Sequence, residues 1–387
     1  MRGVCLPRFN EGNAYSIVLS SRFLADPMLR HIRRAALRVL KSSGIFKAVE
    51  NSRWRRERLL ILCYHGVALE EEHKWIPSLY MHPDLFEQRL EVLHAGSYAV
   101  LPLGEGIERL YRNDLPPKSV AITFDDGTYD FYSQAYPRLK KYGFPATVYQ
   151  TTFYCDYHLP VFHLICSYML WKRRDVPLKA LPEFGISGPL DLKTAAGQTR
   201  VLQALVEFSR KGNLSEEQKN DLASQLAGKL GIDYSELVSK RILQLMRPEE
   251  IARLSYDGID FQLHTHRHRT PLDEALFLRE IRDNRQKLSE MASISTSHFC
   301  YPSGDYHLEF LPWLEKEGVV SATTCEVGLA SRDDRPLLLP RLVDTSRHTP
   351  LEFESWLSGV GAFTSRRQRR YKAPFSPTAR VQAARSQ

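Results

Sequence analysis

The chain contains 387 residues, of which 43% are apolar and 25% are charged, an ordinary composition for a soluble globular protein. No run of 18 or more uncharged apolar residues occurs, so a membrane-spanning helix is not expected. The six cysteines are scattered without a CxxC pair and support neither a zinc finger nor a disulfide framework. We expect them to be small buried residues in a reducing compartment.

The net charge of +8 is located at the two ends of the chain. Residues 1–60 hold 13 basic and 4 acidic side chains, and residues 362–387 hold 7 basic and no acidic ones. Residues 61–361 therefore carry a net charge of about −8. A nucleic-acid partner is not expected, because the positive charge is confined to the ends. No strand pattern within the fold alternates basic and aromatic residues.

Residues 1–58 form a basic N-terminal segment. Its start makes a poor secretory signal, because Glu11 precedes the short apolar run and no small-residue cleavage site follows. Pro27–Glu50 places apolar residues at helical spacing with arginines between them, which predicts a basic amphipathic helix. Such a helix packs on the outside of the domain or lies on an anionic membrane surface, and both alternatives stay open. We expect a cytoplasmic protein, with peripheral association at the inner membrane as the second alternative.

From residue 59 onward, short apolar runs that end in polar residues alternate with helical patterns. Seven buried strands separated by helices predict a parallel α/β sheet or barrel. Helices are expected over residues 84–94, 132–142, 272–291 and 307–317. The strand candidates are Leu59–Tyr64, Ser119–Phe124, Pro145–Thr151, Ile259–Leu263, His298–Tyr301, Val319–Thr324 and Leu337–Leu339.

A long excursion, about residues 154–257, separates the third and fourth strand candidates. It is predicted to be a helical insertion with helices over 195–211, 215–230 and 234–246, because a structureless segment of this length is improbable inside a compact domain. Residues 59–361 would thus form one domain that contains the insertion. Residues 362–387 are basic, contain two prolines and lack apolar periodicity, which predicts a disordered tail.

The first candidate site residues are Asp125 and Asp126, which follow an apolar strand within the sequence TFDDG. Two adjacent carboxylates are costly to ionise together unless a cation compensates them, and Gly127 permits a sharp turn. Catalytic groups of α/β barrels lie at the C-terminal ends of strands. Taken by itself, however, DDG is usually a solvated turn.

The second candidates are His264 and His268, which also follow an apolar strand, in HTHRH. They are four residues apart, so one helical turn would put both imidazoles on one face, as divalent-metal ligation requires. A carboxylate and two histidines make a three-ligand site with open positions, typical of hydrolytic zinc and related sites. The second carboxylate would then be free to act as a base.

These motifs occur in the order found in a known family. TFDDG followed by HTHRH resembles the polysaccharide deacetylase family, the NodB-homology domain of carbohydrate esterase family 4. LCYHGV at 62–67, FCYPSG at 299–304 and LPRL at 339–342 resemble further motifs of this family, and REIRDNRQKL at 279–288 resembles the helix after its histidine motif. The resemblance covers about residues 62–342.

The resemblance implies a distorted (β/α)7-type barrel, to which this chain adds a helical insertion and basic terminal extensions. It also implies that Asp126, His264 and His268 bind a divalent metal, usually Zn²⁺, and that Asp125 is the base that activates water. The backbone N–H of Tyr301, which precedes Pro302 in the FCYPSG motif, would share the developing oxyanion.

Two features depart from the family pattern. Cys300 stands where many relatives carry an arginine that orients the catalytic aspartate, and Arg341 is the candidate substitute because its fork can hold Asp125 ionised. A surface ion pair is the alternative for Arg341. The late histidine element that protonates the leaving amine is absent, so His65 and His348 are candidates and the general acid stays open.

We therefore expect a metal-dependent hydrolase that removes N-acetyl groups from amino sugars of a polysaccharide or a lipid-linked glycan precursor. The alternatives are a hydrolase of other non-peptide C–N bonds on the same fold and a catalytically inactive glycan-binding protein. Four aromatic residues of the insertion would either stack on sugar rings or pack the insertion onto the barrel, and packing is favoured: Tyr154, Tyr157, Phe162 and Trp171.

Overall fold

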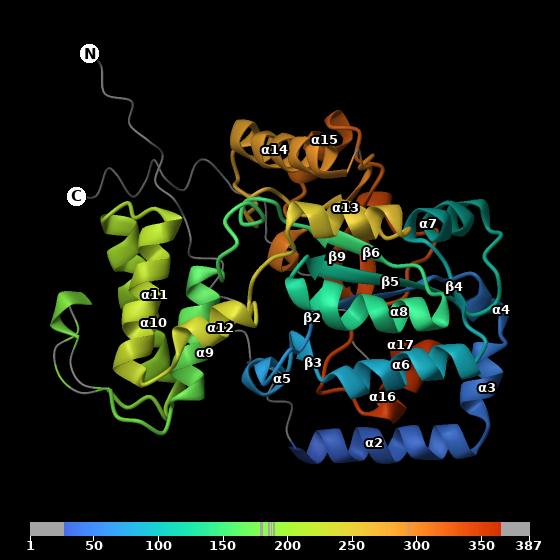
Figure 1. Ribbon diagram of the computed structural model, residues 1–387. Helices are drawn as coiled ribbons and strands as arrows, with labels where there is room; N and C mark the ends of the chain where they lie inside the picture. The colour runs from blue at the N-terminus through green and yellow to red at the C-terminus, as the bar shows by residue number, and fades with distance from the viewer. Residues whose placement is uncertain are drawn as a thin grey trace, which may run out of the picture.

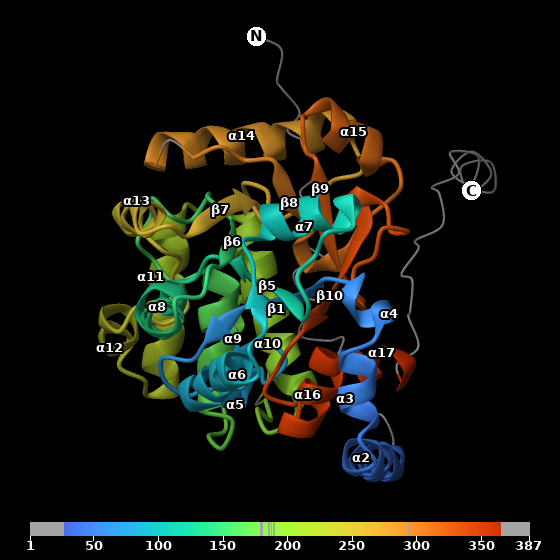
Figure 2. The same cartoon turned by 90° about the vertical axis from the view of Figure 1, so that its right-hand side faces the viewer.

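Seven parallel strands close into a ring at the centre of the molecule (Figure 1 and Figure 2). The computed structural model describes residues 27–364 except 179, 180, 185, 187, 189 and 293. The predicted (β/α)7-type barrel is confirmed. Around the ring the strands are β1 (Leu60–Tyr64), β10 (Leu339–Val343), β9 (Ser321–Val327), β8 (His298–Cys300), β7 (Asp260–Leu263), β6 (Thr147–Gln150) and β5 (Ser119–Asp126), and β5 pairs back onto β1.

Three short strands were not predicted. β4 (Ala99–Val100) pairs with β5 outside the ring, while β2 (Gly66–Val67) and β3 (Tyr80–Met81) pair only with each other. The seventh strand was predicted two residues too early. Pro336–Leu338 forms the 3₁₀ turn η5, and the strand begins at Leu339, because proline favours the first turn of a helix and an apolar run alone does not locate a strand end.

Alternate residues of the strands face two different cores. One set packs inside the ring with α7 (Leu103–Arg112), which contributes Leu103, Ile107 and Leu110 to that cluster; its strand members are Ile61, Ala121, Tyr149, Cys300 and Leu339. The other set packs outward against the surrounding helices in a larger cluster. Because side chains alternate along a strand, Asp125 and Arg341 share the inward parity of Ala121 and Leu339. Two charged side chains are therefore directed into the barrel.

The helices of the barrel lie close to their predicted positions. The predicted helix over 132–142 begins as one turn of π-helix, η2 (Phe131–Ala135), before α8 (Tyr136–Tyr142). The others are α5 (Glu72–Trp75), α6 (Pro83–Ala95), α13 (Pro248–Tyr256), α14 (Glu274–Ala292), the 3₁₀ turn η4 (Pro302–Gly304), α15 (Phe310–Lys316), α16 (Pro350–Ser358) and α17 (Val360–Thr364).

The insertion forms a group of helices beside one end of the barrel (Figure 1). Its elements are α9 (Phe162–Lys172), η3 (Pro182–Phe184), α10 (Ala195–Lys211), α11 (Glu216–Leu230) and α12 (Tyr234–Ser239). These helices share an apolar core of their own, to which Ile76 and Tyr80 of the barrel also contribute. The predicted helix over 234–246 was wrong beyond Ser239, because residues 243–246 instead hydrogen-bond as an extended segment to residues 127–129 and to Val161.

The predicted N-terminal helix is divided into α2 (Pro27–Ser42) and α3 (Ile45–Glu50), and α4 (Arg53–Arg56) follows. Gly44, at a φ of 80°, breaks the helix in a conformation that favours glycine. Leu37 is buried in a small cluster with Phe46 and Val360, whereas Ile32 and Val39 are exposed. The helix thus packs on the outside of the domain, and membrane contact through it stays a prediction. Residues 1–26 and most of the predicted tail lie outside the described residues.

Within the described part of the chain, no helix is both long enough and apolar enough to cross a membrane. Four of the cysteines described there are buried as free thiols, and Cys325 is half-buried.

One buried arginine ties the N-terminal helices to the barrel. Arg55 donates to the backbone oxygens of Leu357, Arg58 and Ser119 at 2.9, 2.8 and 3.1 Å. Its side chain is inaccessible to solvent. The guanidinium therefore joins α4, the end of α16 and the start of β5.

Replacing this residue should destabilise the fold. We expect Arg55→Ala to lower the free energy of unfolding by about 3 kcal/mol, because two buried carbonyls and one partly buried carbonyl lose charge-assisted partners. Arg53→Ala is the control: Arg53 is 88% exposed in a pair with Glu57, so the change should stay within about 0.5 kcal/mol. Urea unfolding followed by circular dichroism measures both, and equal effects of the two variants would contradict the assignment.

Candidate active site

The predicted site residues gather at the C-terminal ends of the barrel strands. Asp125 and Asp126 end β5, His264 follows β7, Tyr301 follows β8, and Arg341 lies within β10. The chain segments that carry them are separated by up to 216 residues in sequence. Because all seven strands are parallel, their ends meet at one mouth of the ring.

Asp126, His264 and His268 form a convergent set of donor atoms. Asp126 Oδ1 lies 3.2 Å from His264 Nε2 and 3.2 Å from His268 Nε2. One ligand atom from each residue lies within 4.8 Å of the others. Two imidazoles and a carboxylate are a ligand set that suits divalent zinc and related metals.

The hydrogen bonds of His264 show that these residues fit a cation. His264 Nδ1 lies 2.9 Å from the backbone oxygen of Cys300, which can only accept, so Nδ1 carries the proton. In the neutral imidazole, Nε2 is then a lone-pair donor that faces the carboxylate oxygen of Asp126. Two acceptors at 3.2 Å need a proton or a metal between them. A backbone partner that fixes the imidazole in this way is typical of metal-ligating histidines.

The backbone of both motifs adopts left-handed conformations. Asp126, Thr265 and His268 have φ values of 72°, 62° and 53°, which non-glycine residues adopt rarely. The predicted helical turn from His264 to His268 was wrong, because this segment is an irregular loop. The imidazoles still meet, with ring centroids 5.0 Å apart. The positive φ values therefore replace helical periodicity as the means of bringing the ligands together.

Gly127 is required at the turn after the two aspartates. Its φ is 75°, and a Cβ there would lie 1.9 Å from Gln150 Oε1. Gln150 itself donates to the backbone oxygen of Thr151 at 2.7 Å. The Asp motif is thus packed tightly against the end of β6.

Two residues of α14 that were not predicted hold the histidine loop. Asn284 Oδ1 accepts from the backbone N–H of His264 at 3.0 Å, and its amide group donates to Gln150 O and Thr152 Oγ1, each at 3.0 Å. Glu280, one turn earlier, accepts from the backbone N–H of Arg267 at 2.8 Å. Glu280 and Asn284 are four residues apart on one face of the helix, and both are polar although that face is buried. This pattern was the sequence signal that could have identified them.

The site residue Asp125 is ion-paired with Arg341 inside the barrel. Arg341 Nη1 donates to Asp125 Oδ1 at 2.7 Å, and Arg341 Nη2 donates to Asp125 Oδ2 at 2.8 Å. Both side chains are buried. Burial alone would raise the pKa of Asp125, but the charge and hydrogen bonds of Arg341 lower it well below its usual range. The predicted contact is therefore present, and a surface ion pair is excluded for Arg341.

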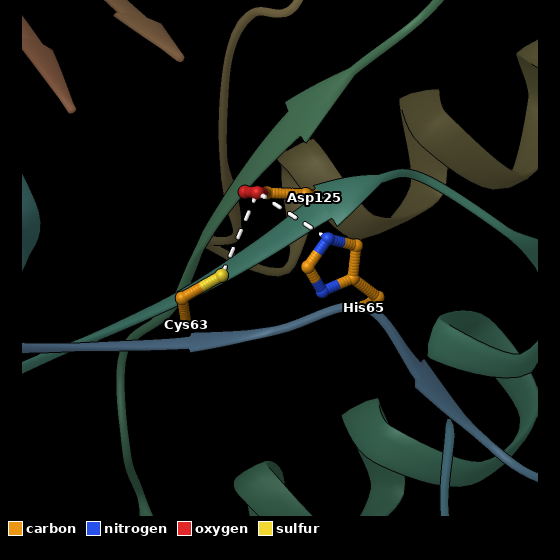
Figure 3. Close-up of side chains that lie close together, drawn as sticks. All are labelled: Cys63, His65 and Asp125. Carbon is orange, nitrogen blue, oxygen red and sulfur yellow. Dashed lines mark hydrogen bonds and ion pairs between the residues drawn. The ribbon is translucent and has the colours of Figure 1, made fainter. Parts of the chain in front are cut away.

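Two side chains from the end of β1 also point toward Asp125 (Figure 3). Cys63 Sγ lies 3.5 Å from Asp125 Oδ2, and His65 Nε2 lies 3.8 Å from the same oxygen. The Nδ1 atom of His65 is buried and has no hydrogen-bond partner within the described residues. Burial lowers the pKa of His65 despite the two nearby aspartates. Cys300 Sγ, at the end of β8, lies 3.4 Å from the same oxygen.

The second histidine candidate belongs to a separate network after β10. His348 Nδ1 lies 3.1 Å from Asp344 Oδ1, and Asp344 Oδ2 accepts from Arg89 Nε at 2.9 Å. Tyr64 donates to the same carboxylate at 3.3 Å. His348 is thus oriented by a buried aspartate.

The FCYPSG motif at residues 299–304 is packed rather than open. The backbone N–H of Tyr301 donates to Thr323 O at 3.3 Å, so it is already paired within the sheet and the predicted oxyanion role gains no support from this arrangement. Pro302 is buried in η4. Of the four insertion aromatics, Phe162 is buried in the core of the insertion, and Trp171 stacks on Tyr168. This favours packing over sugar stacking for these two.

The sequence and the fold of this chain are similar to those of known proteins. The family model described as Polysaccharide deacetylase matches residues 112–322, more than half of the chain. YxkH of Bacillus subtilis (strain 168), named as a polysaccharide deacetylase, is 26% identical over 286 residues, which are 74% of this chain and 71% of YxkH. The solved structure of Streptococcus pyogenes deacetylase PplD in complex with acetate matches with a TM-score of 0.52 at 21% identity, covering 78% of this chain and 97% of PplD. This last likeness shows the fold.

The support from α14 can be tested through stability. We expect Asn284→Ala to lower the free energy of unfolding by about 2–3 kcal/mol, because a buried N–H and a buried carbonyl lose their partner. Gln286→Ala, at an exposed position of the same helix, should change it by less than about 0.5 kcal/mol. Chemical denaturation of both variants measures the difference, and an unaltered midpoint for Asn284→Ala would refute the supporting role.

Proposed function

The chain belongs to the polysaccharide deacetylase family, whose enzymes hydrolyse the amide bonds of N-acetyl groups, and on this premise we propose that it is a metal-dependent de-N-acetylase. The proposed substrate is an N-acetylated amino sugar of a polysaccharide or of a lipid-linked glycan precursor. The observation that carries the proposal is the placement of Asp126, His264 and His268 beside an Asp125 that Arg341 holds ionised. Hydrolysis would give acetate and a free amino sugar.

Asp126, His264 and His268 would hold the metal, for which we propose Zn²⁺ because the set combines two imidazoles with one carboxylate. When bound, such a cation polarises a carbonyl group and makes water acidic enough to attack near neutral pH. The carbonyl of Cys300, which fixes the His264 tautomer, and Asn284, which holds its backbone, support the ligand geometry. A metal held by three protein ligands would keep open positions for water and substrate.

Asp125 would take the proton from the attacking water. A base must be ionised before it can accept, and the ion pair with Arg341 lowers the pKa of Asp125 below its usual range. The bidentate contact also fixes the plane of the carboxylate, because both oxygens are held. Arg341 would thus act on the reaction through Asp125.

His65 would return a proton to the leaving amine. Its Nε2 is 3.8 Å from Asp125 Oδ2, close to the group that receives the proton from water. This distance is longer than a hydrogen bond, and contacts between catalytic groups often shorten only when substrate binds. His348 is the second candidate, because Asp344 orients it, but its Nδ1 is already engaged.

Removal of a ligand should remove both metal and activity. For Asp126→Ala, we expect metal affinity to fall by more than about 100-fold, because loss of a supporting partner alone costs about 10–100-fold. Acetate release from a panel of N-acetylated glycans and small amides should fall with it. Metal analysis by mass spectrometry and an acetate assay give the two readings.

Asp156→Ala is the matched control, because Asp156 is exposed in a pair with Lys287 and should leave both readings unchanged. Acetate release that persists in metal-stripped Asp126→Ala would disprove the mechanism. Release from small amides but from no glycan would instead favour hydrolysis of other C–N bonds.

The two histidine candidates can be separated by substitution. We expect His65→Ala to lower kcat by about 10²–10⁴-fold with bound metal unchanged, the range that general acid–base groups contribute. His348→Ala should stay within about 3-fold of the wild type. Steady-state kinetics with metal analysis decide the matter, and the reverse pattern would assign the proton donor to His348.

A further inference from the structure

Cys63 and His65 continue one face of strand β1 into the mouth of the barrel. Side chains alternate along an extended strand, so both residues share the inward face of Ile61. Strand β1 pairs with β5 in a register that sets Cys63 opposite Thr123. Two residues further along both chains, His65 comes level with Asp125. The pairing of the two strands therefore brings a thiol and an imidazole to the same carboxylate.

The distances between these three side chains are close to those around a metal ion. Cys63 Sγ lies 3.5 Å from Asp125 Oδ2, and His65 Nε2 lies 3.8 Å from the same oxygen. One donor atom of each residue lies within 4.8 Å of the others. With the usual bond lengths around a tetrahedral zinc ion, sulfur and oxygen ligands are about 3.5 Å apart, and nitrogen and oxygen ligands about 3.4 Å apart. Figure 3 shows the thiol and the imidazole turned toward the carboxylate.

The donor atoms of this cluster can be made available to a cation. Neither ring nitrogen of His65 makes a hydrogen bond to the part of the chain that the structure describes, and Nδ1 is buried. The thiol of Cys63 donates to Asp125 Oδ2, so a cation would replace that proton between sulfur and oxygen. The proton leaves to solvent when the sulfur–metal bond forms, because the thiolate is the ligand.

Arg341 limits the affinity of the cluster without preventing binding. Each carboxylate oxygen of Asp125 has two lone-pair sites, and the guanidinium takes one hydrogen bond from each oxygen. The oxygen Oδ2 can therefore keep this contact and still bind a cation. The positive charge of Arg341 repels that cation, however. Cys63, His65 and Asp125 should thus be filled only after the set of Asp126, His264 and His268.

A further grouping of donor atoms, Asp125 with His264 and Cys300, does not make an independent site. His264 Nε2 faces Asp126 and its Nδ1 is bonded to the backbone of Cys300. Cys300 Sγ accepts from Arg341 Nη2 at 3.1 Å. Cys63, His65 and Asp125 instead share no residue with the first ligand set. They can therefore bind a cation while the first set holds its metal.

We propose that Cys63, His65 and Asp125 form a second, inhibitory cation site that selects thiophilic divalent ions, such as Zn²⁺ in excess or Cd²⁺. A thiolate ligand favours these ions over Mg²⁺ and Ca²⁺, which prefer oxygen. The bound cation occupies the oxygen of Asp125 and the nitrogen of His65 through which protons would move, so hydrolysis stops. The inhibition rests on the proposed function, whereas binding of the cation does not.

The binding test adds Cd²⁺ to protein that holds one equivalent of Zn²⁺. A thiolate bound to Cd²⁺ absorbs in the ultraviolet, and the first ligand set contains no sulfur, so this absorption reports binding at a cysteine. We expect the wild type to develop it with one further equivalent. In Cys63→Ser the Kd for this ion should rise more than about 100-fold and the absorption should be lost, because loss of a supporting partner alone costs about 10–100-fold.

The inhibition test measures acetate release from N-acetylglucosamine oligomers at increasing Zn²⁺. The inhibition constant, taken relative to the activity of each variant without added metal, should rise in Cys63→Ser in parallel with the Kd. Cys325→Ser is the matched control, because it removes the half-buried thiol of β9, and it should keep the absorption and the inhibition constant of the wild type. His65→Ala should keep the absorption but bind Cd²⁺ at least about 10-fold more weakly.

Thermal unfolding is measured for every variant. Absence of the absorption in the wild type, or its persistence in Cys63→Ser, would overturn the site. If Cys63→Ser does not fold, unchanged Cd²⁺ affinity in His65→Ala would overturn it equally. A cation bound at Cys63 that leaves acetate release unaffected would overturn the inhibition. A wild type that develops the absorption but releases no acetate from any substrate would refute the proposed function and still support the second site.

Discussion

Two adjacent carboxylates end strand β5, and each of their negative charges must be balanced by a partner. The arrangement of the barrel depends on this requirement. Asp125 and Asp126 are consecutive, so strand geometry sends them in different directions, and each finds a different partner. Asp125 is directed into the barrel, where Arg341 on β10 pairs with it through both oxygens. Asp126, in a left-handed conformation, instead meets two imidazoles from the loop after β7. Because breaking a buried pair leaves an uncompensated charge, the whole ring is constrained to bring β10 and the histidine loop to β5.

Much of this arrangement could be predicted from the sequence because each strand is a short apolar run and each functional group follows directly after one. That pattern located the barrel strands and the two motifs. The pairing of Arg341 with Asp125 could also be predicted from the sequence. Cys300 occupies the position where relatives carry an arginine, and a buried carboxylate needs a cation. The resemblance to the family supplied the order of the motifs.

Other features depend on contacts between distant segments, which spacing along the chain does not contain. The interval of four between His264 and His268 suggested a helical turn, yet the ligands meet through positive φ angles in a loop. Asn284 and Glu280 looked like polar positions on an amphipathic helix, and only packing of α14 on the barrel shows that they hold that loop. The segment after Ser239 had helical periodicity, but pairing with residues 127–129 is the stronger interaction there.

The anchoring of the insertion has a consequence for how such a protein can change. Its two ends are fixed by backbone hydrogen bonds, at residues 152–153 and 244–246, and backbone groups do not depend on side-chain identity. The helices between them pack in a core of their own, and the entropy of closing a connection grows only slowly with its length. The interior of the insertion can therefore be shortened, extended or exchanged during evolution while the two motif loops keep their positions. The insertion and the barrel that carries the two motifs can in this sense diverge at different rates.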